Sequence, residues 1–144
     1  MQNTYNQRAV FLDRDGVINR APVINGKPYS PSSLVELELL PGVIDALQLL
    51  HAKGFKLIVV TNQPNIKRGM TTIQDMEDIH QFLAKTLPID DFYTCLHLDE
   101  DGCACRKPKP GMLLAAAQKH GIALQNSYMI GDRLRDIGAG LQAG

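Results

Sequence analysis

The sequence has no excess of charge of either sign: its 144 residues contain 15 lysines and arginines and 15 aspartates and glutamates. A broad surface for nucleic acid or anionic membrane needs a clear excess of basic residues, so this balance argues against both partners. A small pocket for an anion is not excluded by it. No apolar stretch approaches the ~20 residues that a membrane-spanning helix needs. The sequence therefore predicts a protein with no nucleic-acid and no membrane partner.

Two further absences bear on the cellular compartment. The N-terminal residues 1–7 are polar and lack the apolar stretch of a signal peptide. Cysteine is scarce, and the three that occur are crowded into one segment as Cys95, Cys103 and Cys105. An odd number of clustered cysteines without a secretion signal favours a metal site over a disulfide framework. We therefore expect a cytoplasmic protein.

Short apolar runs alternate with helical patterns along the chain. Strands are expected at 9–12, 55–60, 92–98 and 127–130, and helices at 43–53, 73–87, 112–120 and from 134 onward. This alternation predicts an α/β fold, a Rossmann-like parallel sheet with helices on both faces. The Asn25-Gly26 pair predicts a hairpin turn within the loop 19–33. The length predicts a single domain, residues 1–144, with an incomplete C-terminal end because no strand follows the last helix.

Polar residues follow three of the expected strands, Asp13 after the first, Thr61 after the second and Asp132 after the fourth. In a parallel sheet, ligands bind beyond the carboxyl ends of the strands, so these residues are expected to share one edge. Asp15 lies two residues after Asp13 and is expected to point the same way. Two carboxylates there can bind a hard cation and divide the roles of nucleophile and proton donor. Taken alone, the Asp-x-Asp-Gly pattern is equally a turn signal after a strand.

Four segments carry a resemblance to a known family. They are Phe11-Leu12-Asp13-Arg14-Asp15-Gly16, Val60-Thr61-Asn62-Gln63, Arg106-Lys107-Pro108 and Gly131-Asp132-Arg133-Leu134-Arg135-Asp136. In this order, and over almost the whole chain, they resemble the four motifs of the haloacid-dehalogenase superfamily. Within it, the chain is similar to small phosphatases with a minimal cap that act on heptose bisphosphates or on histidinol phosphate.

The resemblance implies a Mg²⁺-dependent phosphatase that acts through an aspartyl phosphate. Asp13 would be the nucleophile that attacks phosphorus. Asp15 would be the general acid that protonates the leaving alkoxide, and then the base that activates water. Mg²⁺ would bind Asp13, the backbone carbonyl of Asp15 and Asp132, an oxygen-rich set that suits a small hard ion.

The same resemblance implies the groups that hold the phosphate. Thr61, the backbone amide of Asn62 and Lys107 would contact the phosphoryl oxygens as charge shifts in the transition state. Asp136 would orient Lys107. The substrate-binding residues would be Asn62, Gln63 and Arg106.

A second group of residues has the composition of a metal site. Three thiolates and one imidazole, from Cys95, His97, Cys103 and Cys105, make a tetrahedral structural Zn²⁺ site that leaves no position for water. The alternative is a set of buried reduced cysteines beside an exposed histidine. A zinc-bound loop would fix Arg106 and the lysine after it. The other histidines are expected to have no catalytic role, with His80 and His120 exposed on helices.

The expected substrate is a small phosphorylated molecule, and the enzyme is expected to be a monomer. Residues 61–69 and 106–112 resemble the heptose enzymes, so D-glycero-D-manno-heptose 1,7-bisphosphate would lose its 7-phosphate. Its second phosphate would meet Arg106 and the Lys67-Arg68 pair. The five-residue gap between His97 and Cys103 is nearer the histidinol-phosphate enzymes, which keeps histidinol phosphate as the alternative.

Two other classes of function are considered. One is a zinc-stabilised binding module without catalysis, against which the intact set of catalytic residues argues. The other is a redox protein based on Cys103-Ala104-Cys105, which bound zinc would exclude.

Overall fold

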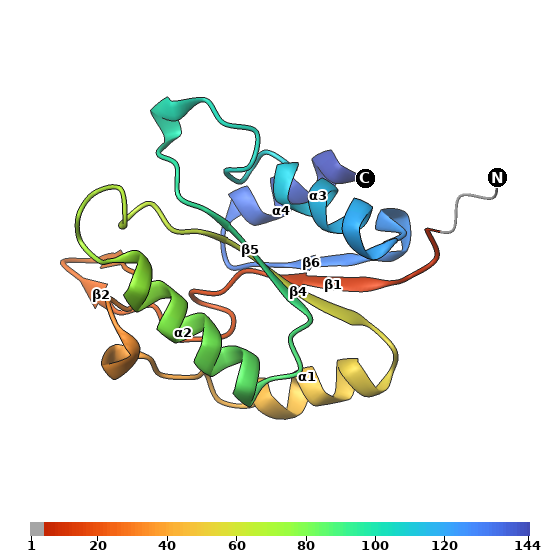
Figure 1. Cartoon of the computed structure of the whole chain (residues 1–144), viewed down its shortest axis with the longest axis horizontal. Coiled ribbons are helices and arrows are strands. Elements are labelled where there is room, and N and C mark those ends of the chain that lie inside the picture. The colour runs from red at the N-terminus through yellow and green to blue at the C-terminus, as the bar shows by residue number, and fades with distance from the viewer. Residues whose placement is uncertain (1–4) are drawn as a thin grey trace.

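A computed structural model describes residues 5–144 of the chain, which form a four-stranded sheet with helices on both faces (Figure 1). The sheet order is β5-β4-β1-β6, and each neighbouring pair is parallel. The strands are β1 Ala9–Leu12, β4 Lys56–Asn62, β5 Asp91–Cys95 and β6 Tyr128–Ile130. The expected α/β fold with a parallel sheet is thus confirmed.

Four helices cover the two faces of the sheet. They are α1 Val43–Ala52, α2 Ile73–Thr86, α3 Gly111–His120 and α4 Leu134–Ala143. In Figure 1, α1 and α2 lie below the sheet, and α3 and α4 lie above it. Three short 3₁₀ helices, η1 Leu34–Glu36, η2 Asp99–Asp101 and η3 Leu124–Asn126, lie in the connections. No helix within residues 5–144 combines the length and apolar character needed to cross a bilayer.

The alternation of side chains along β1 builds two cores. Val10 and Leu12 point to the face that α1 and α2 cover, whereas Ala9 and Phe11 point to the face that α3 and α4 cover. All four are buried, as expected for a central strand with helices on both sides. The register Leu12↔Val59 and Leu12↔Ile130 then brings the ends of β1, β4 and β6 together.

The hairpin predicted between the first strand and the first helix is present. Strands β2 Val23–Ile24 and β3 Lys27–Pro28 pair antiparallel around Asn25 and Gly26. Both turn residues have positive φ, 51° and 76°, which is the conformation that makes Asn-Gly the favoured two-residue hairpin turn. The hairpin therefore projects as a small flap beside the ends of the strands.

The third expected strand is wrong at its C-terminal end, because β5 stops at Cys95 and does not continue to residue 98. The last ladder pair is Asn62↔Cys95, and the carbonyl of Cys95 accepts the N–H of Gln63 at 2.8 Å. Beyond it the chain turns so that Leu98 N–H can donate to the Asp101 carboxylate at 2.7 Å. This early end frees the following residues to form the cysteine-rich loop.

Candidate active site

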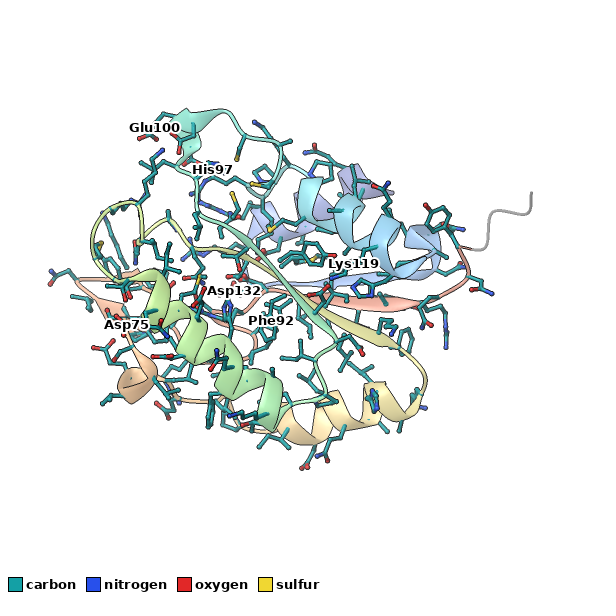
Figure 2. All side chains as sticks on the ribbon, in the orientation of Figure 1. Asp75, Phe92, His97, Glu100, Lys119 and Asp132 are labelled. Atoms are coloured by element: carbon teal, nitrogen blue, oxygen red, sulfur yellow. The ribbon has the colours of Figure 1, made fainter. Side chains whose placement is uncertain are left out.

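A polar pocket of about 470 Å³ lies at the carboxyl ends of the strands, bordered by the hairpin flap and by the loop after β5. Four of the sequence-predicted residues, Asp13, Asp15, Lys107 and Asp132, line it, as do Asn62 and Arg106. Figure 2 shows Asp132 at this edge of the sheet. The basic residues of the wall are Lys27, Arg68, Arg106, Lys107, Arg133 and Arg135. Five carboxylates line the same wall, those of Asp13, Asp15, Asp99, Asp132 and Asp136, so the pocket offers partners both to an anionic ligand and to a cation.

Asp13 and Lys107 form a buried ion pair at the inner end of this pocket. The Asp13 N–H donates to Ile130 O at 3.0 Å, which continues the β1–β6 ladder and fixes where the side chain begins. Lys107 Nζ donates to Asp13 Oδ1 at 2.8 Å and to Asp136 Oδ1 at 2.6 Å. The other oxygen of Asp136 accepts the backbone N–H of Arg133 at 3.1 Å. Asp136 is therefore placed to orient Lys107, and Lys107 is placed to orient Asp13.

Burial sets the protonation of Asp13. Asp13 as a residue is 8% exposed, and its burial raises the pKa of the carboxyl group to about 6. The charge of Lys107 lowers the pKa, whereas the negative charges of Asp136 and Asp15 raise it further. At pH 7 Asp13 is therefore mostly ionised, which is the form in which a carboxylate can attack phosphorus.

Asp15 accepts hydrogen bonds at both of its carboxylate oxygens. Oδ2 accepts from Ser30 Oγ at 2.5 Å and from Gln63 Nε2 at 2.9 Å. Oδ1 accepts from Asn19 Nδ2 at 3.0 Å and from the Arg14 guanidinium at 2.9 and 3.0 Å. Burial raises the pKa of Asp15, but the Arg14 charge and these hydrogen bonds outweigh it and leave the pKa below its usual value. Asp15 is thus a carboxylate held in one orientation.

Residues at the C-terminal end of β4, Thr61 and Asn62, and Gln63 directly after it support the two carboxylates and the lysine. Asn62 Oδ1 accepts the N–H of Lys107 at 3.1 Å, and its Nδ2 donates to Lys107 O at 3.3 Å. Gln63 Nε2 also donates to Thr61 Oγ1 at 2.8 Å, and both of these side chains are buried. The side chains of Asn62 and Gln63 thus contact the other site residues, and they fix the positions of Lys107 and Thr61.

The acidic residues of the pocket fit a hard divalent cation. One carboxylate oxygen from each of Asp13, Asp132 and Asp136 lies within 4.8 Å of the others. Asp136 already contacts Lys107, whereas Asp132 is exposed toward the pocket. Gly16 has φ +86°, and a Cβ at this position would overlap the Asp132 carboxylate. The missing side chain makes room for Asp132, and the all-oxygen donor set is one that Mg²⁺ accepts.

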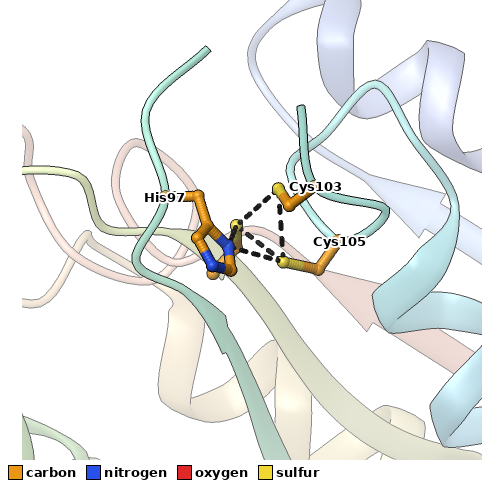
Figure 3. Close-up of side chains that lie close together, drawn as sticks. His97, Cys103 and Cys105 are labelled. Carbon is orange, nitrogen blue, oxygen red and sulfur yellow. Dashed lines mark hydrogen bonds between the residues drawn. The ribbon is translucent and has the colours of Figure 1, made fainter. Parts of the chain in front are cut away.

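The four residues predicted as zinc ligands converge in the loop after β5. Figure 3 shows His97, Cys103 and Cys105 around a common centre. Cys95 Sγ lies 3.7 Å from Cys103 Sγ, and Cys103 Sγ lies 3.6 Å from Cys105 Sγ. His97 Nδ1 lies 3.4 Å from Cys95 Sγ and 3.3 Å from Cys105 Sγ. Zinc–sulfur bonds of ~2.3 Å arranged tetrahedrally place sulfur atoms ~3.8 Å apart. The two distances to Cys103 agree with this spacing, whereas Cys95 Sγ and Cys105 Sγ lie closer together, at 2.8 Å. Three sulfurs and one imidazole nitrogen are the ligand types of a structural Zn²⁺ site, and these two sulfurs would have to move apart to bind the ion.

This cysteine-rich loop joins directly onto the pocket wall. The backbone N–H of Arg106 donates to Cys103 Sγ at 3.4 Å. Burial raises the pKa of the Cys103 thiol, but the backbone N–H groups of Arg106 and Cys105 outweigh it and lower the pKa to about 6. Arg106 Nε donates to Asp99 Oδ1 at 2.5 Å, and its Nη1 donates to His97 O at 3.1 Å. The loop therefore fixes both the backbone and the guanidinium of Arg106.

Lys67 and Arg68, the other two cations expected to contact a second phosphate, have different surroundings in the structure. Lys67 Nζ pairs with Asp101 Oδ2 at 2.6 Å. Arg68 lines the pocket and donates to Asn65 Oδ1 at 3.3 Å. Arg68 rather than Lys67 is thus available beside Arg106.

Several residues of the site escaped sequence reasoning. Ser30 follows the hairpin, and no local pattern marks it; only the fold brings it to Asp15. Arg14 lies between the two motif carboxylates, which was a usable signal. The expectation that His80 and His120 are exposed was wrong, because both are half-buried. His120 Nε2 contacts Asp91 Oδ2 at 2.8 Å, and His80 contacts Arg14.

Comparison with known proteins agrees with this geometry. A family model for the haloacid dehalogenase-like hydrolases matches residues 19–144. The chain belongs to this family and is a phosphatase.

Within this family, the chain is similar to several heptose bisphosphate phosphatases. The chain is 42% identical over 142 residues to the D-glycero-beta-D-manno-heptose-1,7-bisphosphate 7-phosphatase of Helicobacter pylori, covering 94% of this chain and 79% of that one. It is 38% identical over 141 residues to the D-glycero-alpha-D-manno-heptose-1,7-bisphosphate 7-phosphatase of Campylobacter jejuni, covering 94% and 77%. A crystal structure of D,D-heptose 1,7-bisphosphate phosphatase from B. bronchiseptica, complexed with magnesium and phosphate, has a TM-score of 0.81 at 33% identity over 96% and 77% of the two chains.

Proposed function

We propose that this phosphatase removes the 7-phosphate of D-glycero-D-manno-heptose 1,7-bisphosphate through an aspartyl phosphate on Asp13. The observation that carries the proposal is the buried Asp13–Lys107 pair at the inner end of a pocket whose wall carries both basic residues and carboxylates. Relatives named for this reaction, at 38–42% identity, support the choice of substrate.

In the first half of the reaction, Lys107 holds Oδ1 of Asp13 and leaves Oδ2 to attack phosphorus. The Thr61 hydroxyl, the Asn62 N–H and the Lys107 ammonium group contact the phosphoryl oxygens as negative charge moves onto them. Asp15 gives a proton to the sugar oxygen as its bond to phosphorus breaks. The products of this half are the free alcohol and phospho-Asp13.

In the second half, Asp15 is a carboxylate and takes a proton from the water that attacks phospho-Asp13. Its lowered pKa keeps Asp15 ionised for this step, so Asp15 must take up a proton from solvent before it can serve as the acid of the first half. Asp13, the backbone carbonyl of Asp15 and Asp132 would hold Mg²⁺, which supplies positive charge opposite the phosphoryl oxygens when bound. The cysteine-rich loop would hold Zn²⁺ as a structural ion that keeps Arg106 in place.

The second phosphate of the substrate is proposed to contact Arg106, with Arg68 nearby on the same wall. We propose that the enzyme acts as a monomer. The three free thiols of the cysteine-rich loop support a cytoplasmic location for the enzyme.

A panel of phosphate esters, ranked by kcat/KM, tests the proposal. It contains both anomers of the heptose bisphosphate, histidinol phosphate and an aryl phosphate. We expect one heptose anomer to rank first, and a preference for histidinol phosphate would overturn the substrate. Asp13→Asn should lower turnover on every ester by on the order of 10³-fold or more, because the nucleophile is lost. Asp15→Asn should accumulate phospho-Asp13, detectable as a mass shift of one phosphoryl group.

A further inference from the structure

Arg14 is a buried cation that the reaction proposed above does not use. It lies in the bend that follows β1, and its side chain is only 1% exposed. A buried charge is costly unless it is paired and its donors are satisfied. The contacts of the guanidinium therefore indicate what the residue does.

The Arg14 guanidinium joins two side chains. Its Nε and Nη2 both contact Oδ1 of Asp15, at 3.0 and 2.9 Å, while Nη1 lies 3.0 Å from His80 Nε2. Arginine only donates, so His80 Nε2 must be the acceptor and the ring must be neutral with its proton on Nδ1. Burial and the adjacent Arg14 charge lower the pKa of His80 to about 4, which agrees with a neutral ring.

His80 is itself fixed from a second direction. It belongs to α2, and its ring stacks on Phe92 of β5 with 4.7 Å between centroids and 19° between planes. Figure 2 shows Phe92 between β5 and α2. The imidazole is thus held by the packing of helix against sheet, and it presents one acceptor to Arg14.

The two oxygens of Asp15 differ in what surrounds them. The donors to Oδ1 are Arg14 and Asn19, which are 1% and 0% exposed and do not line the pocket. Oδ2 instead accepts from Ser30, which lines the pocket, and from Gln63. The carboxylate therefore has an inner oxygen held by a buried cation and an outer oxygen on the substrate side.

We infer that Arg14 and His80 are positioning residues that fix Oδ1 of Asp15 and leave Oδ2 to exchange the proton. The inference rests on the proposed role of Asp15 as acid and base. During phosphoryl transfer, the proton moves from Oδ2 to the leaving oxygen as the oxygen–phosphorus bond breaks. Without the His80 acceptor, the guanidinium loses one of its two supports and Asp15 turns away from that oxygen.

A purely structural ion pair would behave differently, and the leaving group separates the two cases. An alkyl phosphate releases an alkoxide that needs a proton, whereas p-nitrophenyl phosphate releases a stable phenolate that needs little help. The ratio kcat/KM reports the steps up to release of the alcohol, so it reports the acid role of Asp15 without its later role as base. A misplaced Asp15 must therefore lower kcat/KM selectively for the alkyl ester.

The test compares His80→Phe with His80→Gln on these two monophosphates. Phenylalanine keeps a ring to stack on Phe92 but has no acceptor, whereas the glutamine carbonyl can accept from Arg14. We expect His80→Phe to lower kcat/KM for the alkyl ester about 10- to 100-fold, and for the aryl ester less than about threefold. His80→Gln should recover most of the loss. His51→Phe, an exposed histidine on α1, is the matched control and should leave both values unchanged.

Arg14→Lys provides a second variant should His80→Phe fail to fold. A lysine keeps the charge but lacks the planar fork that reaches both partners, so the same selective loss is expected. Equal loss on the two esters, or no loss, would overturn the positioning role. Asp15→Asn tests the underlying assumption: if it shows no selective loss on the alkyl ester, the role proposed for Asp15 fails. If it does show that loss while His80→Phe and Arg14→Lys do not, only the positioning inference fails.

Discussion

Gly16 and Asp132 lie in direct contact, because the Asp132 carboxylate occupies the space where a side chain at position 16 would begin. Gly16 also has φ +86°, a left-handed conformation that other residues adopt with strain. Gly16→Ala should therefore push Asp132 away from Asp13. We expect the Mg²⁺ concentration for half-maximal activity to rise by on the order of 10-fold.

Gly54→Ala is the matched control for this change. Gly54 has φ +87°, but a Cβ there would meet nothing within 4 Å. Both variants should lose about 1 kcal/mol of stability from backbone strain, whereas only Gly16→Ala should change the Mg²⁺ dependence. An unchanged Mg²⁺ requirement in Gly16→Ala would show that Asp132 does not bind the ion.

The raised pKa of Asp13 predicts a pH-dependent loss of stability. The folded-state pKa of about 6 exceeds the unfolded value of 3.8, so the folded protein binds the proton more tightly. Stability from this group is present below pH 3.8 and is lost as the pH rises to about 6. In Mg²⁺-free buffer, Asp13→Asn should therefore become more stable than the wild type over this interval, by up to about 3 kcal/mol above pH 6.

Urea unfolding at several pH values measures this difference. Chelators are left out, so that the zinc site is not stripped. Asp45→Asn, which changes an exposed carboxylate on α1, provides the matched control. A difference between Asp13→Asn and the wild type that stays constant from pH 4 to pH 7 would contradict the prediction.

The cysteine-rich loop predicts about one tightly bound zinc per chain. Sites of this kind bind Zn²⁺ with roughly 10–16 kcal/mol at neutral pH, so the metal should remain through purification. His97→Asn removes the Nδ1 donor and should lower both the zinc content and the melting temperature. It should also lower kcat by roughly 10- to 100-fold, because the loop holds Arg106 and the adjacent Lys107.

Metal analysis and thermal unfolding check the zinc prediction. His51→Asn makes the same substitution at an exposed position on α1 and should retain the metal. Protein prepared without chelator that contains no zinc would defeat the assignment.

The position of Arg106 in the pocket predicts that its removal raises KM more for a bisphosphate than for a monophosphate. Arg106→Ala should raise KM for a heptose bisphosphate at least about 10-fold more than for an aryl monophosphate, because only the bisphosphate loses an anion contact. Arg20→Ala is the control, since Arg20 pairs with Glu38 on the surface and does not line the pocket. An equal rise in KM for both esters would give Arg106 a purely structural role.

Much of the fold could be predicted from the sequence because the strong signals are local. Apolar runs locate β1 and β4, and the Asn25-Gly26 pair locates the hairpin. Thr72 stands directly before the expected helix, and its Oγ1 accepts the N–H of Asp75 at 3.0 Å, as a residue that caps a helix N-terminus does. The C-terminal end of β5 could not be predicted in this way. The chain leaves the sheet after Cys95 so that His97 can approach Cys105, and the apolar pattern of the strand contains no signal for that contact.

In the candidate site, too, local patterns predicted some residues, whereas others depend on contacts that only the fold creates. The carboxylates at strand ends could be found from the rule that parallel strands share a ligand-binding edge. Ser30 and His80 could not, because their importance comes from contacts with Asp15 and Arg14 across the fold. Helical spacing says which face of α2 carries His80, but it does not say that Arg14 reaches that face.

The hydrogen bond from Arg106 N–H to Cys103 Sγ has a consequence for the environment in which the enzyme works. The Cys103 sulfur atom is thus one hydrogen bond away from Arg106, a residue of the pocket wall. An oxidant or a competing thiophilic metal that modifies Cys103 would remove the acceptor that holds Arg106. Hydrolysis of the sugar phosphate would then fall as Cys103 is oxidised, although this residue does not line the pocket. Reductant together with zinc would restore activity after oxidation to a sulfenic acid or a disulfide, but not after oxidation to a sulfinic acid.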